Sequence, residues 1–192
     1  SWRDSHLNTA TNIYTQAIDF DRLSVQLQKS NQCLLLRLHP NEAHLVTELS
    51  QYPNIINVTF WDDIYGILEK IDLLITDYSS IYIDALQYSC EIAFFLFDKA
   101  HYQAECRSEY PYVAKLPKAG IDLITFKDLQ DYLNEFADKQ EDLTQREAIN
   151  WLQGSTRSRL MSTFWQYKSR CAFDCLDAFV QDEQIKATKK PA

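Results

Sequence analysis

Glycine is scarce in this 192-residue sequence, which contains only Gly66, Gly120 and Gly154. The loops that cradle phosphates in P-loop proteins and in dinucleotide-binding proteins need several glycines at close, fixed spacing. Neither fingerprint can be assembled from three glycines that lie so far apart. A phosphate site in this chain would therefore have to use a helix N-terminus and side-chain hydroxyls.

Positive charge is also in deficit, because the formal net charge is -8. A nucleic-acid-binding domain usually presents a basic face, so we expect no nucleic-acid partner. The basic stretch Lys186–Lys190 predicts a frayed, solvated tail at 183–192 rather than a membrane-contacting patch. The rest, residues 1–182, is predicted to form one domain.

Long apolar runs and a signal peptide are both lacking. A membrane-spanning helix needs about 18 or more consecutive apolar residues, and no such run occurs. The five cysteines are odd in number and irregular in spacing, which favours reduced thiols in a cytoplasmic protein over a disulfide framework. Cys171 and Cys175 share a helix face without a Cys-x-x-Cys pair or a nearby histidine, which favours core packing over a metal site. We expect no metal and no cofactor.

Hydrophobic residues make up 46% of the chain, enough for one globular domain with a core. Short apolar runs predict strands. The segments between the first four predicted strands are expected to be helical, with helices at about 41–49, 64–70 and 79–89. This alternation is typical of an α/β, Rossmann-like parallel sheet with helices on both faces. The predicted strands are 33–38, 55–60, 72–76, 92–97 and 121–125.

The two ends of the domain carry further predictions. Residues 20–30 predict a helix, and a doubly wound domain normally opens with a strand before its first helix. No strand precedes Trp2, so we expect that the chain is truncated just after one. Residues 101–120 predict a long loop, and 126–136 predict a helix. Added C-terminal helices are expected to carry one apolar stripe, formed by Leu160, Phe164, Tyr167, Cys171, Cys175 and Phe179.

Ligands of an open parallel sheet bind beyond the carboxyl ends of its strands, and polar residues crowd two of these ends. Arg37 and His39 follow the first predicted strand and lie on the same side of it. The guanidinium could bind a diphosphate, and the imidazole could protonate a leaving phosphate oxygen. Alternatively, Arg37 pairs with a carboxylate and His39 only completes the strand end. The spacing does not decide between these interpretations.

The second polar strand end is Thr76-Asp77-Tyr78-Ser79-Ser80. Ser79 and Ser80 open a helix, where free amides and two hydroxyls could bind a donor phosphate. The alternative is ordinary N-capping, for which one serine is sufficient. Asp77 would repel a phosphate, so it is predicted to orient the loop, a serine or a ribose hydroxyl.

Trp61 and Asp62 follow the second predicted strand. They could form part of a nucleobase pocket through backbone groups and an aromatic wall. The alternative is a helix cap, with Asp62 or Asp63 as the capping residue, beside a core tryptophan.

These residues together resemble a known family. The run Asp72–Ser80, Asp-Leu-Leu-Ile-Thr-Asp-Tyr-Ser-Ser, resembles the signature of CDP-glycerol glycerophosphotransferases, and Asp84 follows it on an apolar helix. Arg37-Leu38-His39-Pro40 matches the family's Arg-x-His-Pro motif. Trp2-Arg3-Asp4 matches a tripeptide that follows the first strand of the family's C-terminal domain.

The resemblance implies a GT-B fold of two Rossmann-like domains, of which this chain would be the C-terminal, donor-binding one. It implies Arg37, Ser79 and Ser80 as ligands of the donor phosphates and His39 as the catalytic acid. Thr76, Asp77, Trp61 and Asp62 are the candidate nucleotide contacts.

The implied reaction transfers glycerol phosphate from CDP-glycerol, or a related polyol phosphate, to a teichoic-acid-like or capsular polymer of the cell envelope. The polymer or lipid-linked acceptor would bind through an absent N-terminal half, so the isolated chain is expected to be inactive. The implied location is cytoplasmic, with peripheral association at the membrane.

The sequence also departs from the family's pattern. The family's Arg-Gly-Phe-Tyr-like segment is replaced by Cys106–Tyr110, Cys-Arg-Ser-Glu-Tyr, and its Asp-Gly-x-x-x-x-Arg element is only echoed at 153–159. A GT-B glycosyltransferase using a nucleotide sugar, or a degenerate fragment without catalysis, therefore remain alternatives.

Overall fold

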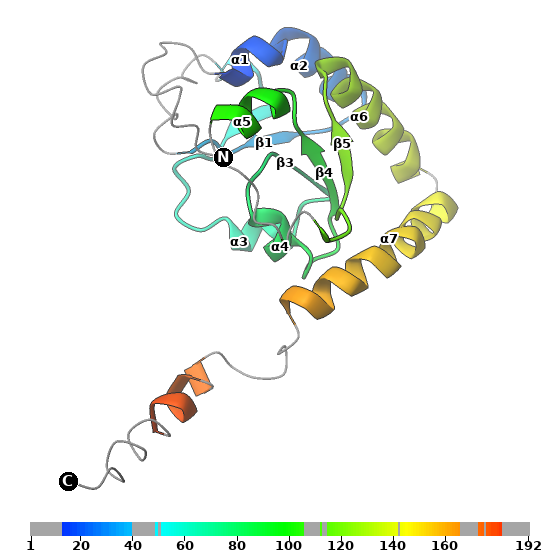
Figure 1. The fold of residues 1–192 in the computed structure, drawn as a ribbon. Coiled ribbons are helices and arrows are strands. Elements are labelled where there is room, and N and C mark those ends of the chain that lie inside the picture. Colours follow the sequence, from blue (N-terminus) through cyan, green and yellow to red (C-terminus); the bar gives the residue numbers. More distant parts are fainter. Residues whose placement is uncertain are drawn as a thin grey trace, which may run out of the picture.

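The computed structural model describes residues 13–39, 49, 51–105, 112, 115–141, 143–165, 173–174 and 176–181. Its strands lie in the middle of the molecule, with helices on both sides (Figure 1). Along the chain the order is α1–α2–β1–β2–α3–β3–α4–β4–α5–β5–α6–α7. The predicted α/β class is confirmed.

All described strand pairs are parallel, and each predicted strand is found at its place but is shorter than expected. The strands are β1 (Leu34–Leu36), β2 (Ile55–Asn57), β3 (Leu73–Thr76), β4 (Glu91–Phe95) and β5 (Ile121–Leu123). They form two groups: β1 pairs with β2, and β4 pairs with both β3 and β5. Among the described strands, β1 and β3 therefore each have one hydrogen-bonded neighbour.

One face of the strands is covered by α2 (Phe20–Lys29) and α6 (Phe126–Glu141). Asp19 begins α2 as its N-cap, since its carboxylate accepts a hydrogen bond from the Arg22 amide at 3.0 Å. Leu23 and Leu27, one turn apart, are buried. With residues of β4, β5 and α6 they form the larger core, which includes Phe20, Ile55, Ala93, Phe95, Leu123, Leu129, Tyr132 and Leu133.

The opposite face is covered by α4 (Ile81–Ala85) and α7 (Leu143–Phe164). A second apolar cluster lies there, consisting of Ala85, Leu86, Cys90, Ile92 and Leu160. The short helix α3 (Tyr65–Leu68) lies on the same side of the strands in Figure 1. Because the two clusters take alternate residues of β4, the expectation of a sheet with both faces covered is confirmed.

Two helices were not expected from the sequence. A short helix, α1 (Ile13–Ala17), precedes α2, and α5 (Lys99–Glu105) occupies the start of the segment predicted as a long loop. The predicted C-terminal stripe was wrong as a single buried face. Leu160 is 1% exposed whereas Phe179 is 62% exposed, because the helical residues 176–181 extend away from the strands (Figure 1).

Several predictions fall outside the described residues. They concern the Trp2–Asp4 motif, the helix predicted after Pro40, the Cys106–Tyr110 segment, the pair Cys171 and Cys175, and the tail at 183–192. Within the described ranges, no helix combines the length and the apolar character needed to cross a membrane.

Candidate functional site

The carboxyl ends of β1 and β3 open into one cavity of about 1980 Å³. Arg37 and His39, which follow β1, line it together with Thr76, Asp77 and Ser79, which end and follow β3. The structure therefore brings the two predicted polar strand ends to the same space. Ser80, Trp61 and Asp62 do not line that cavity.

Arg37 is exposed, and its guanidinium holds the loop that follows β2. Its Nη1 donates a hydrogen bond to the Trp61 carbonyl oxygen at 2.9 Å. The next residue, Leu38, is buried and donates its amide to Thr59 Oγ1 at 3.1 Å. These two bonds fix the exit of β1 against the exit of β2, and the Arg37 bond uses one of five guanidinium N–H groups.

His39 is exposed two residues beyond Arg37, with the buried Leu38 between them. This alternation agrees with the prediction that the guanidinium and the imidazole lie on the same side of the chain.

Asp77 is buried, at 7% exposure, and its carboxylate organises the loop after β3. Oδ1 accepts a hydrogen bond from the Ser79 amide at 3.1 Å, and Oδ2 accepts one from the Tyr14 hydroxyl at 2.8 Å. The carboxylate thus connects α1 to the loop and shapes the backbone that presents the serines. This geometry favours the loop-orienting interpretation of Asp77.

The two serines differ in what their hydroxyls do. Ser79 Oγ accepts a hydrogen bond from the Ile81 amide at 3.4 Å, which is long for such a bond. Ser80 occupies the N-cap position of α4, yet its side chain makes no capping hydrogen bond and is exposed. Capping therefore does not account for the Ser80 hydroxyl.

Trp61 and Asp62 lie on the exposed loop after β2. The Trp61 side chain is 49% exposed, so the alternative of a core tryptophan is wrong. The N-cap position of α3 is occupied by Ile64, and of the two aspartates it is Asp63 whose Oδ1 accepts a hydrogen bond from the Tyr65 amide, at 2.8 Å.

Tyr78, within the predicted signature, has a role that sequence reasoning missed. Its ring stacks on that of Tyr102 with centroids 3.7 Å apart, and its hydroxyl donates a hydrogen bond to Asp98 Oδ1 at 3.0 Å. Asp98 lies in the β4–α5 connection and Tyr102 lies on α5, so this contact holds the loop after β3 from its other side. No local spacing signals this pairing or that of Tyr14 with Asp77, because the partners are 20 or more residues apart.

Among the residues with described positions, no group of three or more His, Cys, Asp or Glu side chains could hold a metal ion. The polar groups that the site offers are those of Arg37, His39, the serine hydroxyls and backbone amides. These are hydrogen-bond donors and fixed positive charge, the groups that bind phosphate oxygens.

Known proteins resemble this chain in both sequence and fold. A sequence model of the family CDP-Glycerol:Poly(glycerophosphate) glycerophosphotransferase matches residues 1–159. The teichoic acid ribitol-phosphate polymerase TarL of Staphylococcus aureus (strain NCTC 8325 / PS 47) is 30% identical over 120 residues, which are 61% of this chain and 21% of TarL. TarK of the same organism is 34% identical over 88 residues, which are 44% of this chain and 17% of TarK.

Structures of the wall teichoic acid polymerase TagF share the fold. One, obtained after a soak with CDPG, has a TM-score of 0.58 and 22% identity, covering 85% of this chain and 42% of TagF. A second has a TM-score of 0.56 at 22% identity, covering 85% and 43%. The chain thus spans less than half the length of each of these relatives. On the family match over residues 1–159, the chain belongs to the CDP-glycerol:poly(glycerophosphate) glycerophosphotransferase family.

Proposed function

We propose that this chain is the donor-binding domain of a transferase that moves glycerol phosphate, or a related polyol phosphate, from a CDP-activated donor to a polymer. The polymer would be teichoic-acid-like or capsular, as part of cell-envelope synthesis. The observation that carries the proposal is the convergence of Arg37, His39 and Ser79 on one cavity at two strand ends. Family membership and the TagF fold support it.

The donor diphosphate would be held between the two strand ends. Arg37 supplies a guanidinium whose planar set of N–H groups suits phosphate oxygens, and it has N–H groups beyond the one that bonds to Trp61. On the other side, the exposed Ser80 hydroxyl and the Ser79 hydroxyl would donate to phosphate oxygens. The buried Asp77 would keep the Ser79 backbone in place, since its two carboxylate oxygens accept hydrogen bonds from the Ser79 amide and the Tyr14 hydroxyl.

His39 would act as the acid in the transfer step. A hydroxyl at the end of the polymer would give its proton to a base of the acceptor half, and its oxygen would bond to the phosphorus of the glycerol phosphate. The bond from this phosphorus to the CMP oxygen would break at the same time. The leaving CMP oxygen gains negative charge, which a proton from the imidazole neutralises. Histidine suits this role because its proton exchanges near neutral pH.

The nucleotide would extend from the diphosphate toward the loop after β2. The Trp61 ring is exposed there and offers a flat apolar surface for a base. Asp62 and Thr76 would provide polar contacts to the nucleoside. The Arg37 bond to the Trp61 carbonyl connects this loop to the phosphate site. Donor phosphates bound by Arg37 would therefore also order the loop after β2.

The proposal includes a partner half and a location. An N-terminal domain would bind the polymer or lipid-linked acceptor, so this chain by itself would bind the donor without turnover. The enzyme would work in the cytoplasm, with peripheral contact to the membrane at which the acceptor is anchored. Turnover by the isolated chain would contradict this division of roles.

Calorimetry on the isolated chain tests donor binding. We expect CDP-glycerol and CMP to bind and UDP-sugars not to bind. The double change Ser79→Ala and Ser80→Ala should weaken CDP-glycerol binding while lowering the melting temperature little. Ser89→Ala, at an exposed serine beyond α4, is the matched control. Binding of UDP-sugars alone would support a nucleotide-sugar enzyme instead, and absence of nucleotide binding would support a degenerate domain.

The role of His39 is tested in a longer parent that includes the acceptor half. His39→Ala should lower kcat steeply with little change in CDP-glycerol affinity, because the proton matters only as the bond breaks. His101→Ala, at a half-buried histidine on α5, is the control. Normal turnover of the His39 variant would remove the imidazole from the mechanism.

A further inference from the structure

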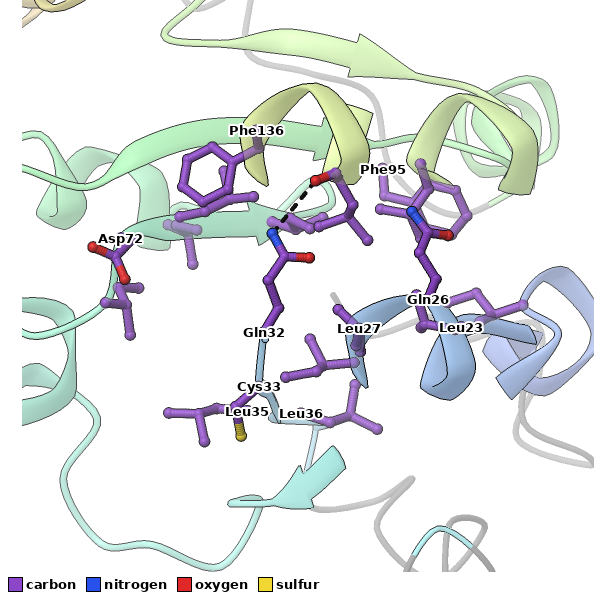
Figure 2. A pocket seen from close by; sticks show the side chains of 18 of the residues that line it. Leu23, Gln26, Leu27, Gln32, Cys33, Leu35, Leu36, Asp72, Phe95 and Phe136 are labelled. Atoms are coloured by element: carbon purple, nitrogen blue, oxygen red, sulfur yellow. Dashed lines mark hydrogen bonds between the residues drawn. The ribbon is translucent and has the colours of Figure 1, made fainter. Parts of the chain in front are cut away.

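The end of β1 passes from an apolar wall of the cavity to polar side chains. Leu35 and Leu36 of this strand lie in the wall, among other apolar side chains (Figure 2). The residues that follow alternate in exposure, because Leu38 is buried whereas Arg37 and His39 are exposed. The directions of the guanidinium and the imidazole therefore depend on how the backbone at Leu38 is held.

The hydrogen-bonded ladder between β1 and β2 stops just before this point. The Leu34 amide donates to the Asn54 carbonyl at 2.9 Å. Further along, the Val58 amide donates to the Leu36 carbonyl at 2.9 Å. In a parallel pair such bonds recur at every second residue of each strand. If the ladder continued, the Leu38 amide would donate to the Val58 carbonyl.

The chain after β2 turns away instead. The Val58 carbonyl accepts a hydrogen bond from the Trp61 amide at 3.1 Å, which closes a turn over residues 58–61. The Leu38 amide donates to Thr59 Oγ1 at 3.1 Å. A side-chain hydroxyl thus takes the place of the next backbone acceptor, and it extends the contact between the two strands by one hydrogen bond.

The hydroxyl of Thr59 acts where water has little access, since Leu38, Val58 and Thr59 are all buried. A buried amide without an acceptor is unfavourable, so the Leu38 amide depends on Thr59. The Thr59 backbone is fixed in turn, because its amide donates to Oδ1 of Asn57, the last residue of β2, at 3.0 Å. Thr59 therefore has a defined position from which to hold the end of β1.

The same turn also holds the far end of the Arg37 side chain. Arg37 Nη1 donates to the carbonyl of Trp61, the last residue of the turn, at 2.9 Å. The backbone beside Arg37 and its guanidinium are thus both bonded to residues 58–61. Without the Thr59 hydroxyl, the Leu38 amide would lose its acceptor, and the end of β1 would shift relative to the turn. The guanidinium would then change direction.

We propose that Thr59 is a positioning residue of the donor site, an inference that rests on the proposed function because it takes Arg37 as the ligand of the donor phosphates. The Thr59 hydroxyl oxygen holds the Leu38 amide and thereby directs the guanidinium toward the cavity. Thr59 itself does not line the cavity. Its effect on donor binding therefore passes through Arg37.

Two substitutions at Thr59 separate the hydroxyl from the shape of the side chain. Thr59→Val keeps the branched shape and removes the hydroxyl, whereas Thr59→Ser keeps the hydroxyl and removes the methyl group. In calorimetry on the full chain, we expect Thr59→Val to weaken CDP-glycerol binding by about tenfold, because a small displacement of a ligand-binding group is costly. Thr59→Ser should restore nearly the affinity of the unaltered chain.

Ser24→Ala is the matched control, because it also removes a buried hydroxyl that bonds next to β2. Ser24 Oγ donates to Asn54 Oδ1 at 2.8 Å, at the opposite, amino end of that strand. The melting temperature of this variant should fall as that of Thr59→Val does, while its affinity for CDP-glycerol stays unchanged. A loss of stability alone would therefore not reproduce the expected effect on binding.

A double-mutant cycle with Arg37 identifies the route of the effect. If Thr59 acts through the guanidinium, Thr59→Val should weaken CDP-glycerol binding no further in a chain that already carries Arg37→Ala. Additive losses of affinity would show that the two residues act independently, and they would overturn the proposal.

The outcomes distinguish this proposal from the function on which it rests. Absence of CDP-glycerol binding by the unaltered chain would overturn the proposed function, and this proposal with it. Binding by the unaltered chain, together with equal affinities of the two Thr59 variants, would overturn this proposal alone. If Thr59→Val does not fold, Asn57→Ala replaces it, because this change at an exposed residue releases the Thr59 backbone. It should also weaken binding, and unchanged affinity would contradict the role of Thr59.

Discussion

Arg157 on α7 holds the end of the helix that begins with the candidate serines. Its Nε donates to the Leu86 carbonyl at 3.0 Å, and its Nη1 donates to the Cys90 carbonyl at 3.0 Å. Its Nη2 donates to the Ala85 carbonyl at 2.7 Å and also to that of Tyr88. One guanidinium thus bonds to four backbone carbonyls between the end of α4 and the start of β4. The last carbonyls of a helix have no partner within the helix, so a donor from elsewhere in the chain stabilises them.

The change Arg157→Met keeps the apolar stem and removes the five N–H groups. A hydrogen bond from a charged donor contributes about 1.5–3 kcal/mol, and part of this is recovered when water reaches the carbonyls. We therefore expect the free energy of unfolding to fall by about 3 kcal/mol. This is less than the sum of four such bonds, because water can reach the half-buried carbonyls once the guanidinium is removed. For a chain of this size the melting temperature should fall by about 6–12 °C.

Thermal and urea unfolding followed by circular dichroism measure this loss. Arg159→Met is the matched control, since Arg159 is exposed and the Ser162 and Thr163 hydroxyls bond to its backbone carbonyl, which the substitution keeps. It should change stability by no more than about 0.5 kcal/mol. The buried Cys90 thiol should also react faster in the Arg157 variant. Equal melting of the two variants would refute the structural role of the guanidinium.

Three further changes test the scaffold. Gly120→Ala should destabilise the fold by about 2 kcal/mol in urea unfolding, because the added methyl would overlap the Ile92 carbonyl. Tyr14→Phe should cost about 1–2 kcal/mol in the same assay, because it removes the hydrogen bond from the Tyr14 hydroxyl to the buried Asp77 carboxylate. For Asp128, hydrogen bonds from the first residues before α6 hold the carboxyl pKa below its usual 3.8. Asp128→Asn should therefore lower stability near neutral pH, and the difference should disappear as the pH falls through that depressed pKa.

The sequence was sufficient to locate the strands and both polar strand ends. Apolar runs such as Cys33–Leu38 mark strands because interior strands of a parallel sheet bury both faces. The run was three residues longer than β1, and two of these residues, Arg37 and Leu38, bond to the loop after β2 instead of continuing the strand. Hydrophobic patterns indicate burial, and burial continues past the end of the hydrogen-bonded ladder.

Long-range polar contacts could not be predicted in the same way. Tyr14 and Asp77 are 63 residues apart, and Arg157 meets Leu86 across 71 residues. The helical or strand periodicity of the sequence could not reveal either contact, because each depends on how the helices pack on the strands.

The proposed donor site draws on two separate groups of strands. Arg37 belongs to the β1–β2 pair and Ser79 to the β3–β4–β5 group, and no described strand pairing joins these groups. A donor diphosphate reaching from the guanidinium to the serine hydroxyls requires a constant distance between them. Calorimetry on the variant with both Ser79→Ala and Ser80→Ala therefore measures how much of CDP-glycerol binding depends on the β3 exit.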